Sequence, residues 1–406
     1  MGQDGHAMVA TKVTDRFTDK FTDNWWAPGL ASLAIAVVLV ALGLVRSGGD
    51  VSILVHAAPP WTDPALARDS LTVQEPDQGF DGQFFYRLGV SPWSSDETVA
   101  GVTNDLPALR NARWGYGALA WVLSAANPDL VPVALVVINL GAAFALGVAG
   151  GALARSAGRR RIWGTLFILW PGFAYSLTMD TSELMASALL LWTLVVARQR
   201  KWGLASLLLS AAVITRDTTA VVVFGFVASG LWLTLRKQRW HPSLVTGLIP
   251  AAVFGGWQLI QYQRFGELPF SSSSGSNLSS PLGGLVELWS TTALPTTSAE
   301  ALRLISSILV IGLIGATGYF GRGSSATIAE KAAWCGAVAV VVVLNAYLWS
   351  GATAFMRAST EAGVLSIVIL LGVKGRRVEQ VLGQVLGASL GVAWMATAAA
   401  QLAKLG

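Results

Sequence analysis

Long apolar runs separated by mostly short polar connections constrain this chain more than any other feature of its sequence. A helix that spans a bilayer needs about 20 mainly apolar residues, and runs of helix-like length lie at about 26–45, 131–153, 162–178, 182–197, 203–215, 218–235, 243–262, 301–320, 332–349, 359–373 and 383–401. Only 13% of the residues are charged, against roughly 25% in soluble domains. The sequence therefore predicts an all-α polytopic membrane protein with about eleven transmembrane helices, and excludes a soluble globular enzyme or a disordered chain.

The polar segment at 1–25 has an apolar residue every four positions, at Val13, Phe17, Phe21 and Trp25. This spacing places the four side chains on one face of a helix, so we expect a cytoplasmic amphipathic helix lying on the membrane surface. A disordered tail is the alternative. The length of this polar segment argues against a cleavable signal peptide.

The distribution of basic residues predicts the topology, including the place of a weaker apolar run at 113–126. If the N-terminus is cytoplasmic and this run does not cross, 18 of the 28 basic residues and 6 of the 23 acidic residues lie inside. The net charge is then +12 inside and −7 outside. We therefore expect the run at 113–126 to be a re-entrant or membrane-lying helix on the outer side.

This topology divides the chain into four parts. After the segment at 1–25 comes a transmembrane module at 26–262, which includes a large first outer loop at 46–130. A second outer loop at 263–300 is rich in Ser and Gly, with a short amphipathic piece near 285–289. The rest, 301–406, forms the C-terminal transmembrane helices.

The densest group of polar and aromatic residues in the first outer loop is Phe80-Asp81-Gly82-Gln83-Phe84-Phe85-Tyr86-Arg87. On a helix that begins near Gly82, Gln83 and Arg87 share a face at i and i+4. Asp81 then stands at the N-cap of this helix, so a capping role is the alternative to a catalytic one.

Further charged residues stand at the predicted outer ends of spans, where polar groups are functional candidates. Asp180 and Glu183 occupy one tight hairpin, and a helix-capping box is their alternative role. Arg216 and Asp217 occupy another hairpin, where a local ion pair is the alternative. Candidate phosphate ligands are Arg357 in a third outer connection, with Arg110 and Arg113 beside the weaker apolar run. Arginine remains charged and binds phosphate in a bidentate way, whereas interfacial snorkelling is the alternative.

Several other kinds of function are disfavoured. No P-loop or HExxH motif is present, and no GxGxxG follows a predicted strand, which argues against a soluble nucleotide donor. With a single cysteine, Cys335, a disulfide framework or a Cys-based metal site is not possible, and the three histidines lie too far apart in sequence to favour a His-rich metal site. The net charge of +5 is explained by cytoplasmic loops, so no nucleic-acid partner is expected.

The stretch at 80–87 is similar to the acid-small-x-aromatic-tyrosine stretch in the first outer loop of the GT-C superfamily of integral-membrane glycosyltransferases. The likeness is to members that use polyprenyl- or dolichyl-phosphate mannose, including the PIG-V-like branch. The stretch at 109–116 resembles the basic-aromatic segment that follows it, and 215–218 resembles a hairpin of related bacterial members with Asp217 in place of Glu. The GT-C plan of spans covers most of the chain, whereas the final third matches no motif.

The resemblance implies an inverting mannosyltransferase-like enzyme of cell-envelope biosynthesis in a bacterial plasma membrane, with its active site on the outer face. Asp81 is then the general base, and the sugar comes from a polyprenyl-phosphate donor and goes to a lipid or glycan acceptor. Mannose is the favoured sugar, ahead of arabinose or glucose. The implied donor-phosphate ligands are Arg87, Arg110, Arg113, Arg216 and Arg357, and the implied substrate-binding residues are Gln83, Tyr86, Asp180, Glu183 and Asp217.

The resemblance implies no cofactor. A divalent metal would be held by Asp81 with Asp180 or Glu183, but a donor with a single phosphate does not favour one. Two other classes of function stay open from the sequence: a flippase or transporter of lipid-linked sugars, and a structural subunit of an envelope complex. Charges midway through spans would favour a transporter, and here the charges stand at the predicted outer ends of spans instead.

Overall fold

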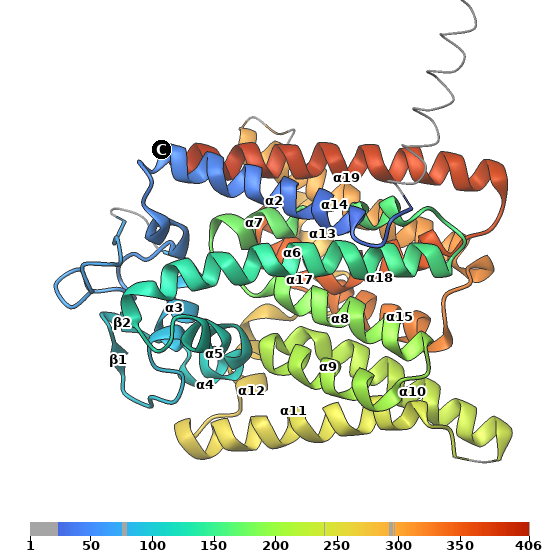
Figure 1. Ribbon diagram of the computed structural model, residues 1–406, viewed down its shortest axis with the longest axis horizontal. Coiled ribbons are helices and arrows are strands. Elements are labelled where there is room, and N and C mark those ends of the chain that lie inside the picture. The colour runs from blue at the N-terminus through green and yellow to red at the C-terminus, as the bar shows by residue number, and fades with distance from the viewer. Residues whose placement is uncertain (1–22, 75–78, 239, 292–294, 296, 406) are drawn as a thin grey trace, which may run out of the picture.

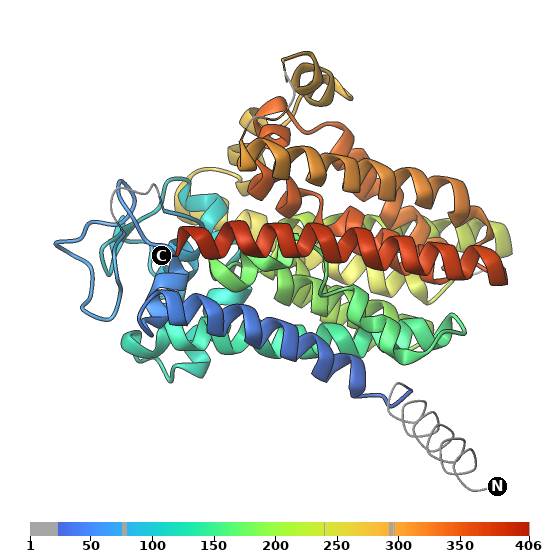
Figure 2. The ribbon, with the colours of Figure 1, turned by 90° about the horizontal axis from the view of Figure 1, so that it is seen from above.

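A computed structural model describes residues 23–74, 79–238, 240–291, 295 and 297–405 of the chain. The amphipathic helix expected over 1–25 falls almost entirely outside these described residues. Long helices run side by side along the longest axis of the molecule (Figures 1 and 2), and most of the segment at 46–130 gathers at one end of them. This segment is called the outer segment below.

Six helices in the described part are long and apolar enough to cross a membrane. They are α2 (Ala27–Arg46), α6 (Val131–Ser156), α10 (Ala220–Lys237), α11 (Ser243–Phe265), α14 (Ser298–Phe320) and α19 (Arg376–Lys404). Each coincides with an apolar run of the sequence, because a run of this length satisfies all of its backbone hydrogen bonds only as a helix when lipid surrounds it. The chain is thus a mostly helical protein with several helices of membrane-crossing length, as the sequence predicts.

The other apolar runs form shorter helices: α7 (Gly172–Thr178), α8 (Glu183–Arg198), α9 (Trp202–Thr215), α15 (Ile328–Val342), α16 (Ala346–Ser350), α17 (Ala352–Ala358) and α18 (Thr360–Leu371). The axes of α17 and α18 differ by 54°, and the two make a seventh span if they are counted as one broken helix. Because five of the eleven runs form helices of fewer than 18 residues, the number of spans stays a prediction.

Two runs that were expected to be single helices are interrupted, so those expectations were wrong. The run at 162–178 consists of the 3₁₀ helix η3 (Arg161–Leu166) and α7, with Pro171 between them. Proline has no backbone N–H and cannot continue a helix from the preceding turn. The run at 332–349 breaks after α15, where the Asn345 side chain accepts the N–H of Leu348 and starts α16.

The outer segment is made of short elements, in keeping with its turn-rich sequence. They are η1 (Val51–Val55), α3 (Gly82–Val90), the antiparallel pair β1 (Thr98–Val99) and β2 (Val102–Thr103), α4 (Pro107–Ala112), α5 (Trp114–Leu123) and η2 (Pro128–Leu130). The weaker apolar run at 113–126 is indeed a short helix, α5, separate from α6. In the second outer loop lie α12 (Pro269–Asn277) and α13 (Gly283–Thr291), and α13 covers the amphipathic piece expected near 285–289.

A small apolar core fixes the outer segment against the first turns of α6. Phe85 on α3 meets the ring of Tyr116 on α5 edge to face, with 5.2 Å between centroids. The Tyr116 hydroxyl donates to the carbonyl of Leu135 at 2.9 Å, so the aromatic ring is buried and its polar tip is satisfied. Asp81 at the start of α3 is thereby held at a fixed position relative to the membrane helices.

Gly82 sets how closely the start of α3 approaches its neighbours. A Cβ atom at this position would lie 2.4 Å from the carbonyl oxygens of both Val55 and Met179. Only glycine allows the backbone of the outer segment to pack this tightly against the end of α7.

Candidate functional site

Asp81 stands at the N-cap position of α3, but its side chain makes no capping hydrogen bond. Its Oδ1 instead accepts from Nη1 of Arg110 at 2.8 Å, and its Oδ2 accepts from Nη2 of Arg357 at 2.7 Å. Nη1 of Arg113 lies 3.6 Å from the same Oδ2. The capping interpretation of Asp81 is therefore wrong, because its carboxylate instead meets three arginines, one on α4, one between α4 and α5, and one on α17.

Glu183, the first residue of α8, forms the buried part of the same network. Its Oε1 accepts from Nε of Arg357 at 2.6 Å and also from Nη1 of Arg216. Ser176 donates to its Oε2 at 3.2 Å. The helix-capping box expected as an alternative for Glu183 is absent, because no side chain caps the start of α8.

Arg216 follows α9 and links Glu183 to α18. Its Nε donates to Oε1 of Glu361 at 3.1 Å and to the hydroxyl of Thr218 at 2.7 Å. The alternative of a local Arg216–Asp217 pair is wrong, since Asp217 instead accepts from Nε of Arg113 at 3.2 Å.

Arg110 and Arg357 are also held by contacts outside Asp81. Arg110 binds Asp105 in a bidentate way through Nε and Nη2, both at 2.7 Å. Its guanidinium also lies over the ring of Phe84, 4.1 Å from the centroid, and Arg357 lies over Phe80 in the same manner at 4.8 Å. Stacked and bidentate guanidinium groups are held in one orientation, which favours a site with fixed geometry.

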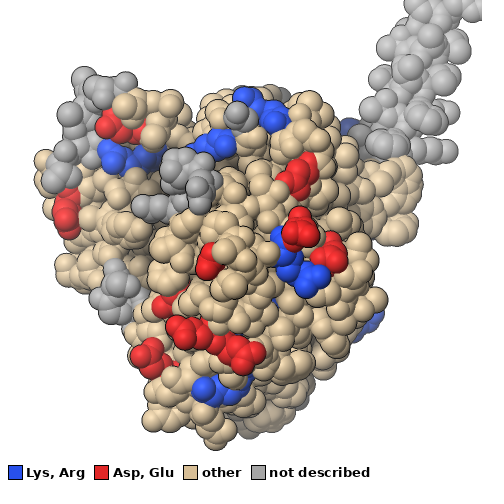
Figure 3. Space-filling model, turned by 90° about the vertical axis from the view of Figure 1, so that its left-hand side faces the viewer, with Lys and Arg blue, Asp and Glu red and all other residues tan. Residues whose placement is uncertain are grey.

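Together these residues form one arginine–carboxylate cluster: Asp81, Asp105, Arg110, Arg113, Glu183, Arg216, Asp217, Arg357 and Glu361. Burial differs between the two sides of the cluster. The side chain of Glu183 is fully buried, whereas those of Asp81 and Asp217 are 17% and 22% exposed. The cluster therefore has a dry interior and an edge that solvent or a substrate reaches. Figure 3 views the molecule from the end that holds the outer segment, where acidic and basic side chains lie near one another.

The electrostatics of Asp81 follow from its neighbours. Burial by itself raises the pKa of this carboxyl group, but the charges of Arg110, Arg357 and Arg113 outweigh burial and hold the pKa well below its ordinary value. Asp81 is thus ionised at neutral pH, and among these arginines it has little affinity for a proton.

Four predicted site residues lie outside the cluster. Gln83 is buried and accepts from the hydroxyl of Thr62 at 2.7 Å, which ties α3 to the preceding loop. Tyr86 is fully buried in the small apolar core of the outer segment. Arg87, also buried, donates from Nη2 to the backbone carbonyl of Asp96 at 2.5 Å. The structure thus does not bring Gln83, Tyr86 or Arg87 into the cluster around Asp81.

Asp180 is the fourth of these residues, and it is buried in the hairpin between α7 and α8. Its backbone is left-handed, with φ of 43°, which Asp tolerates better than most residues. Burial raises the pKa of Asp180 well above its ordinary value, although the amide of Asn139 acts in the opposite direction. Asp180 and Glu183 therefore have different surroundings: among the described residues Asp180 forms no ion pair with an arginine, whereas Glu183 lies between two arginines.

Sequence reasoning missed Asp105 and Glu361 as members of the site. Both lie near a predicted arginine, five residues before Arg110 and four residues after Arg357. On a helix an acid at i+4 from an arginine suggests a local pair, but Glu361 reaches Arg216 instead, 145 residues away. The sequence thus showed an acidic residue near each of these arginines, but it did not show that Glu361 pairs with Arg216.

No group of three or more His, Cys, Asp or Glu side chains is arranged to hold a metal ion among the residues that the structure describes. Every carboxylate of the cluster is within ion-pair distance of an arginine instead.

Comparison of the chain with protein-family models, with curated proteins and with solved structures finds no match. The residues of the cluster and their surroundings are therefore the basis for assigning a function.

Proposed function

We propose that this protein is an inverting glycosyltransferase of the GT-C type with about eleven spans in a bacterial plasma membrane. It moves a sugar, with mannose favoured, from a polyprenyl-phosphate donor to a lipid or glycan acceptor on the outer face. The observation that carries the proposal is the convergence of Arg110, Arg113 and Arg357 on Asp81 at the accessible edge of the cluster. In this arrangement the carboxylate can act as a base, and the guanidinium groups beside it can bind a phosphate.

The three arginines suit a leaving phosphate. Their guanidinium groups lie 2.7 to 3.6 Å from the Asp81 oxygens, so a phosphate bound next to this carboxylate meets several N–H donors at once. Bidentate guanidinium contacts to phosphate are strong and directional. They stabilise the negative charge that grows on the phosphate as the bond to the sugar breaks.

Asp81 is the proposed general base. The acceptor hydroxyl oxygen forms a bond to the anomeric carbon, the bond from that carbon to the phosphate oxygen breaks, and the hydroxyl proton passes to the Asp81 carboxylate. A single displacement of this kind inverts the anomeric centre. A donor phosphate bound among the arginines neutralises part of their charge, which raises the proton affinity of the Asp81 carboxylate.

Glu183, Arg216 and Glu361 act as positioning residues in this proposal. Glu183 binds Arg357 from the dry side of the cluster, and Arg216 joins Glu183 to Glu361 on α18. The guanidinium of Arg357 is consequently fixed between two carboxylates, one buried and one accessible. Asp217 holds Arg113 in the same way at the accessible edge.

The experiment that tests the function uses the purified full chain in liposomes, with a polyprenyl-phosphate mannose donor and an envelope-lipid acceptor on one leaflet. Formation of mannosylated lipid supports the proposal, whereas movement of the donor across the bilayer without product supports the transporter. Donors carrying arabinose or glucose are run in parallel to identify the sugar. No product with any donor, together with co-purification of a larger active enzyme, supports the structural subunit.

The matched variants are Asp81→Asn and Asp69→Asn, which change the same residue type within the outer segment. Asp69 is exposed, and the cluster does not include it. Loss of transfer in the first variant with normal transfer in the second supports the base assignment. Transfer at the wild-type rate by Asp81→Asn would falsify it.

A further inference from the structure

A cavity of about 260 Å³ lies away from the cluster, between α8, α9, α10, α11 and α15. Its walls come from the C-terminal end of α8, the C-terminal half of α10 and the N-terminal ends of α9, α11 and α15, so it lies near one end of these five helices. The proposed chemistry is at the opposite ends of α8 and α9, where Glu183 begins the first and Arg216 follows the second. This cavity, called the end cavity below, is therefore separate from the proposed active site.

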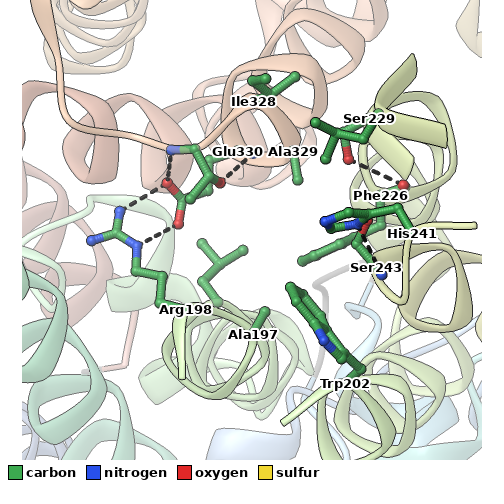
Figure 4. Close-up of a pocket in the computed structure, with 13 residues that line it drawn as sticks. Ala197, Arg198, Trp202, Phe226, Ser229, His241, Ser243, Ile328, Ala329 and Glu330 are labelled. Carbon is green, nitrogen blue, oxygen red and sulfur yellow. Dashed lines mark hydrogen bonds and ion pairs between the residues drawn. The ribbon is translucent and has the colours of Figure 1, made fainter. Parts of the chain in front are cut away.

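Most of the lining of the end cavity is apolar, with a few polar groups gathered on two sides (Figure 4). On one side Arg198 forms a bidentate pair with Glu330, at 2.7 and 2.8 Å. On the other side His241 and Ser243 are hydrogen-bonded to each other, beside the indole of Trp202. An apolar cavity with a small number of converging polar groups is the usual form of a site for a small molecule or a lipid.

The segments that line the end cavity also carry exposed basic residues close to the lining in sequence. Arg200 and Lys201 lie between two lining residues, Arg198 and Trp202, and Arg236 and Lys237 lie between the lining residues Leu233 and His241. All four are exposed, and no ion pair joins any of them to an acid in the part of the chain that the structure describes. The one acid that lines the cavity, Glu330, is already paired with Arg198. Exposed basic residues without an ion pair among the described residues thus adjoin the lining at this end of the five helices.

We propose that the end cavity binds one anionic phospholipid, with an acyl chain against its apolar walls and the phosphate headgroup on the rim of Arg200, Lys201, Arg236 and Lys237. Charge complementarity favours an anionic lipid as the ligand. Apolar walls accommodate the acyl chain of any phospholipid, whereas basic rim residues favour a negatively charged headgroup. The ends of transmembrane helices also lie at the depth of lipid headgroups.

The test uses the full chain purified in neutral detergent and titrated with phosphatidylglycerol or with phosphatidylcholine, and counts bound lipids by native mass spectrometry. We expect one phosphatidylglycerol to be retained per chain and phosphatidylcholine to be retained far less. The double variant Lys201→Gln/Lys237→Gln removes two exposed charges and should weaken phosphatidylglycerol binding by about tenfold or more. Equal retention of the two lipids by the wild-type protein would overturn the proposal.

Two further variants locate the site. Lys404→Gln removes one exposed charge at the other end of α19 from its start, away from the rim, and should leave binding unchanged. Ser229→Leu places a larger side chain into the cavity wall and should reduce the retained lipid from one to none. A loss of binding in Lys404→Gln as large as in the double variant would show that total charge, not the rim, attracts the lipid. Because the rim residues are exposed, the double variant tests the proposal even where Ser229→Leu does not fold.

Discussion

The two central carboxylates of the cluster should respond differently to neutralisation, and this difference separates a catalytic site from a structural ion network. In Glu183→Gln, two arginines lose a fully buried partner that both contact. Removing one member of a buried ion pair costs about 3–5 kcal/mol, because the charge left behind stays desolvated. In Asp81→Asn the arginines keep Asp105, Asp217 and Glu183 as partners, and solvent reaches the site. The cost should then be about 1–2 kcal/mol.

These costs convert into shifts of melting temperature. Unfolding entropy of about 2.1 cal/mol/K per residue gives about 0.85 kcal/mol/K for a chain of this length. The expected decreases are therefore about 4–6 °C for Glu183→Gln and about 1–2 °C for Asp81→Asn. Intrinsic fluorescence of the 17 tryptophans reports unfolding of the purified protein in detergent.

Sugar-transfer activity should show the opposite order: Asp81→Asn, the more stable variant, should lose more activity than Glu183→Gln. Asp81→Asn should reduce sugar transfer by at least about 100-fold, because a general base contributes this much or more. Glu183→Gln should retain part of the activity at a temperature where it is folded, since it acts through Arg357. Equal losses of stability in the two variants, with transfer unchanged in Asp81→Asn, would refute this reasoning and leave the cluster a structural network.

Gly82→Ala should destabilise the protein by about 1–3 kcal/mol, because its Cβ meets two carbonyl oxygens; the control Gly255→Ala, which has open space, should not lower the melting temperature. For Asp180, the unfolded chain releases its proton near pH 4 while the folded chain keeps it, so stability falls as pH rises from about 4 toward the raised pKa. Asp180→Asn should therefore gain melting temperature relative to wild type as pH rises from 5 to 8, and a constant difference would contradict this. The depressed pKa of Asp81 implies that this carboxyl does not titrate between pH 5 and 8 in the free protein, so kcat/KM should show no acid limb from it there. An acid limb in that range that disappears in Asp81→Asn would refute the electrostatic account. Arg110→Lys, which cannot keep the bidentate contact with Asp105, should raise KM for the donor several-fold, measured by transfer kinetics.

The membrane helices were readable from the sequence because their signal is local. An apolar run as long as 131–153 favours a membrane-spanning helix over other structures. The helix α6 extends this run by only three residues. The breaks at Pro171 and Asn345 were harder to predict, because each competes with strong apolar runs on both sides. In both places a single residue changes the hydrogen bonding of one turn, while the composition of the run stays apolar.

The ion pairs of the cluster could not be predicted from the sequence, although most of the residues that form them were identified there. Asp81 and Arg357 are 276 positions apart, and Glu183 and Arg357 are 174 apart. Charged residues at helix ends identify candidates by their cost in lipid, but pairing depends on how the helices pack. Local expectations, such as a cap at Asp81 or a pair of Arg216 with Asp217, failed because a tertiary partner satisfied the same group.

The sequence alone thus determined that the chain forms long apolar helices and which few charges stand at their ends. The length of an apolar run and its residue types are local properties of a segment, so they can be predicted without knowing which segments pack against it. The tertiary structure decided which charges meet, which are dry and which remain accessible. These depend on close approaches such as that of Gly82 to Met179, because a shift of a few ångströms between two helices makes or breaks an ion pair.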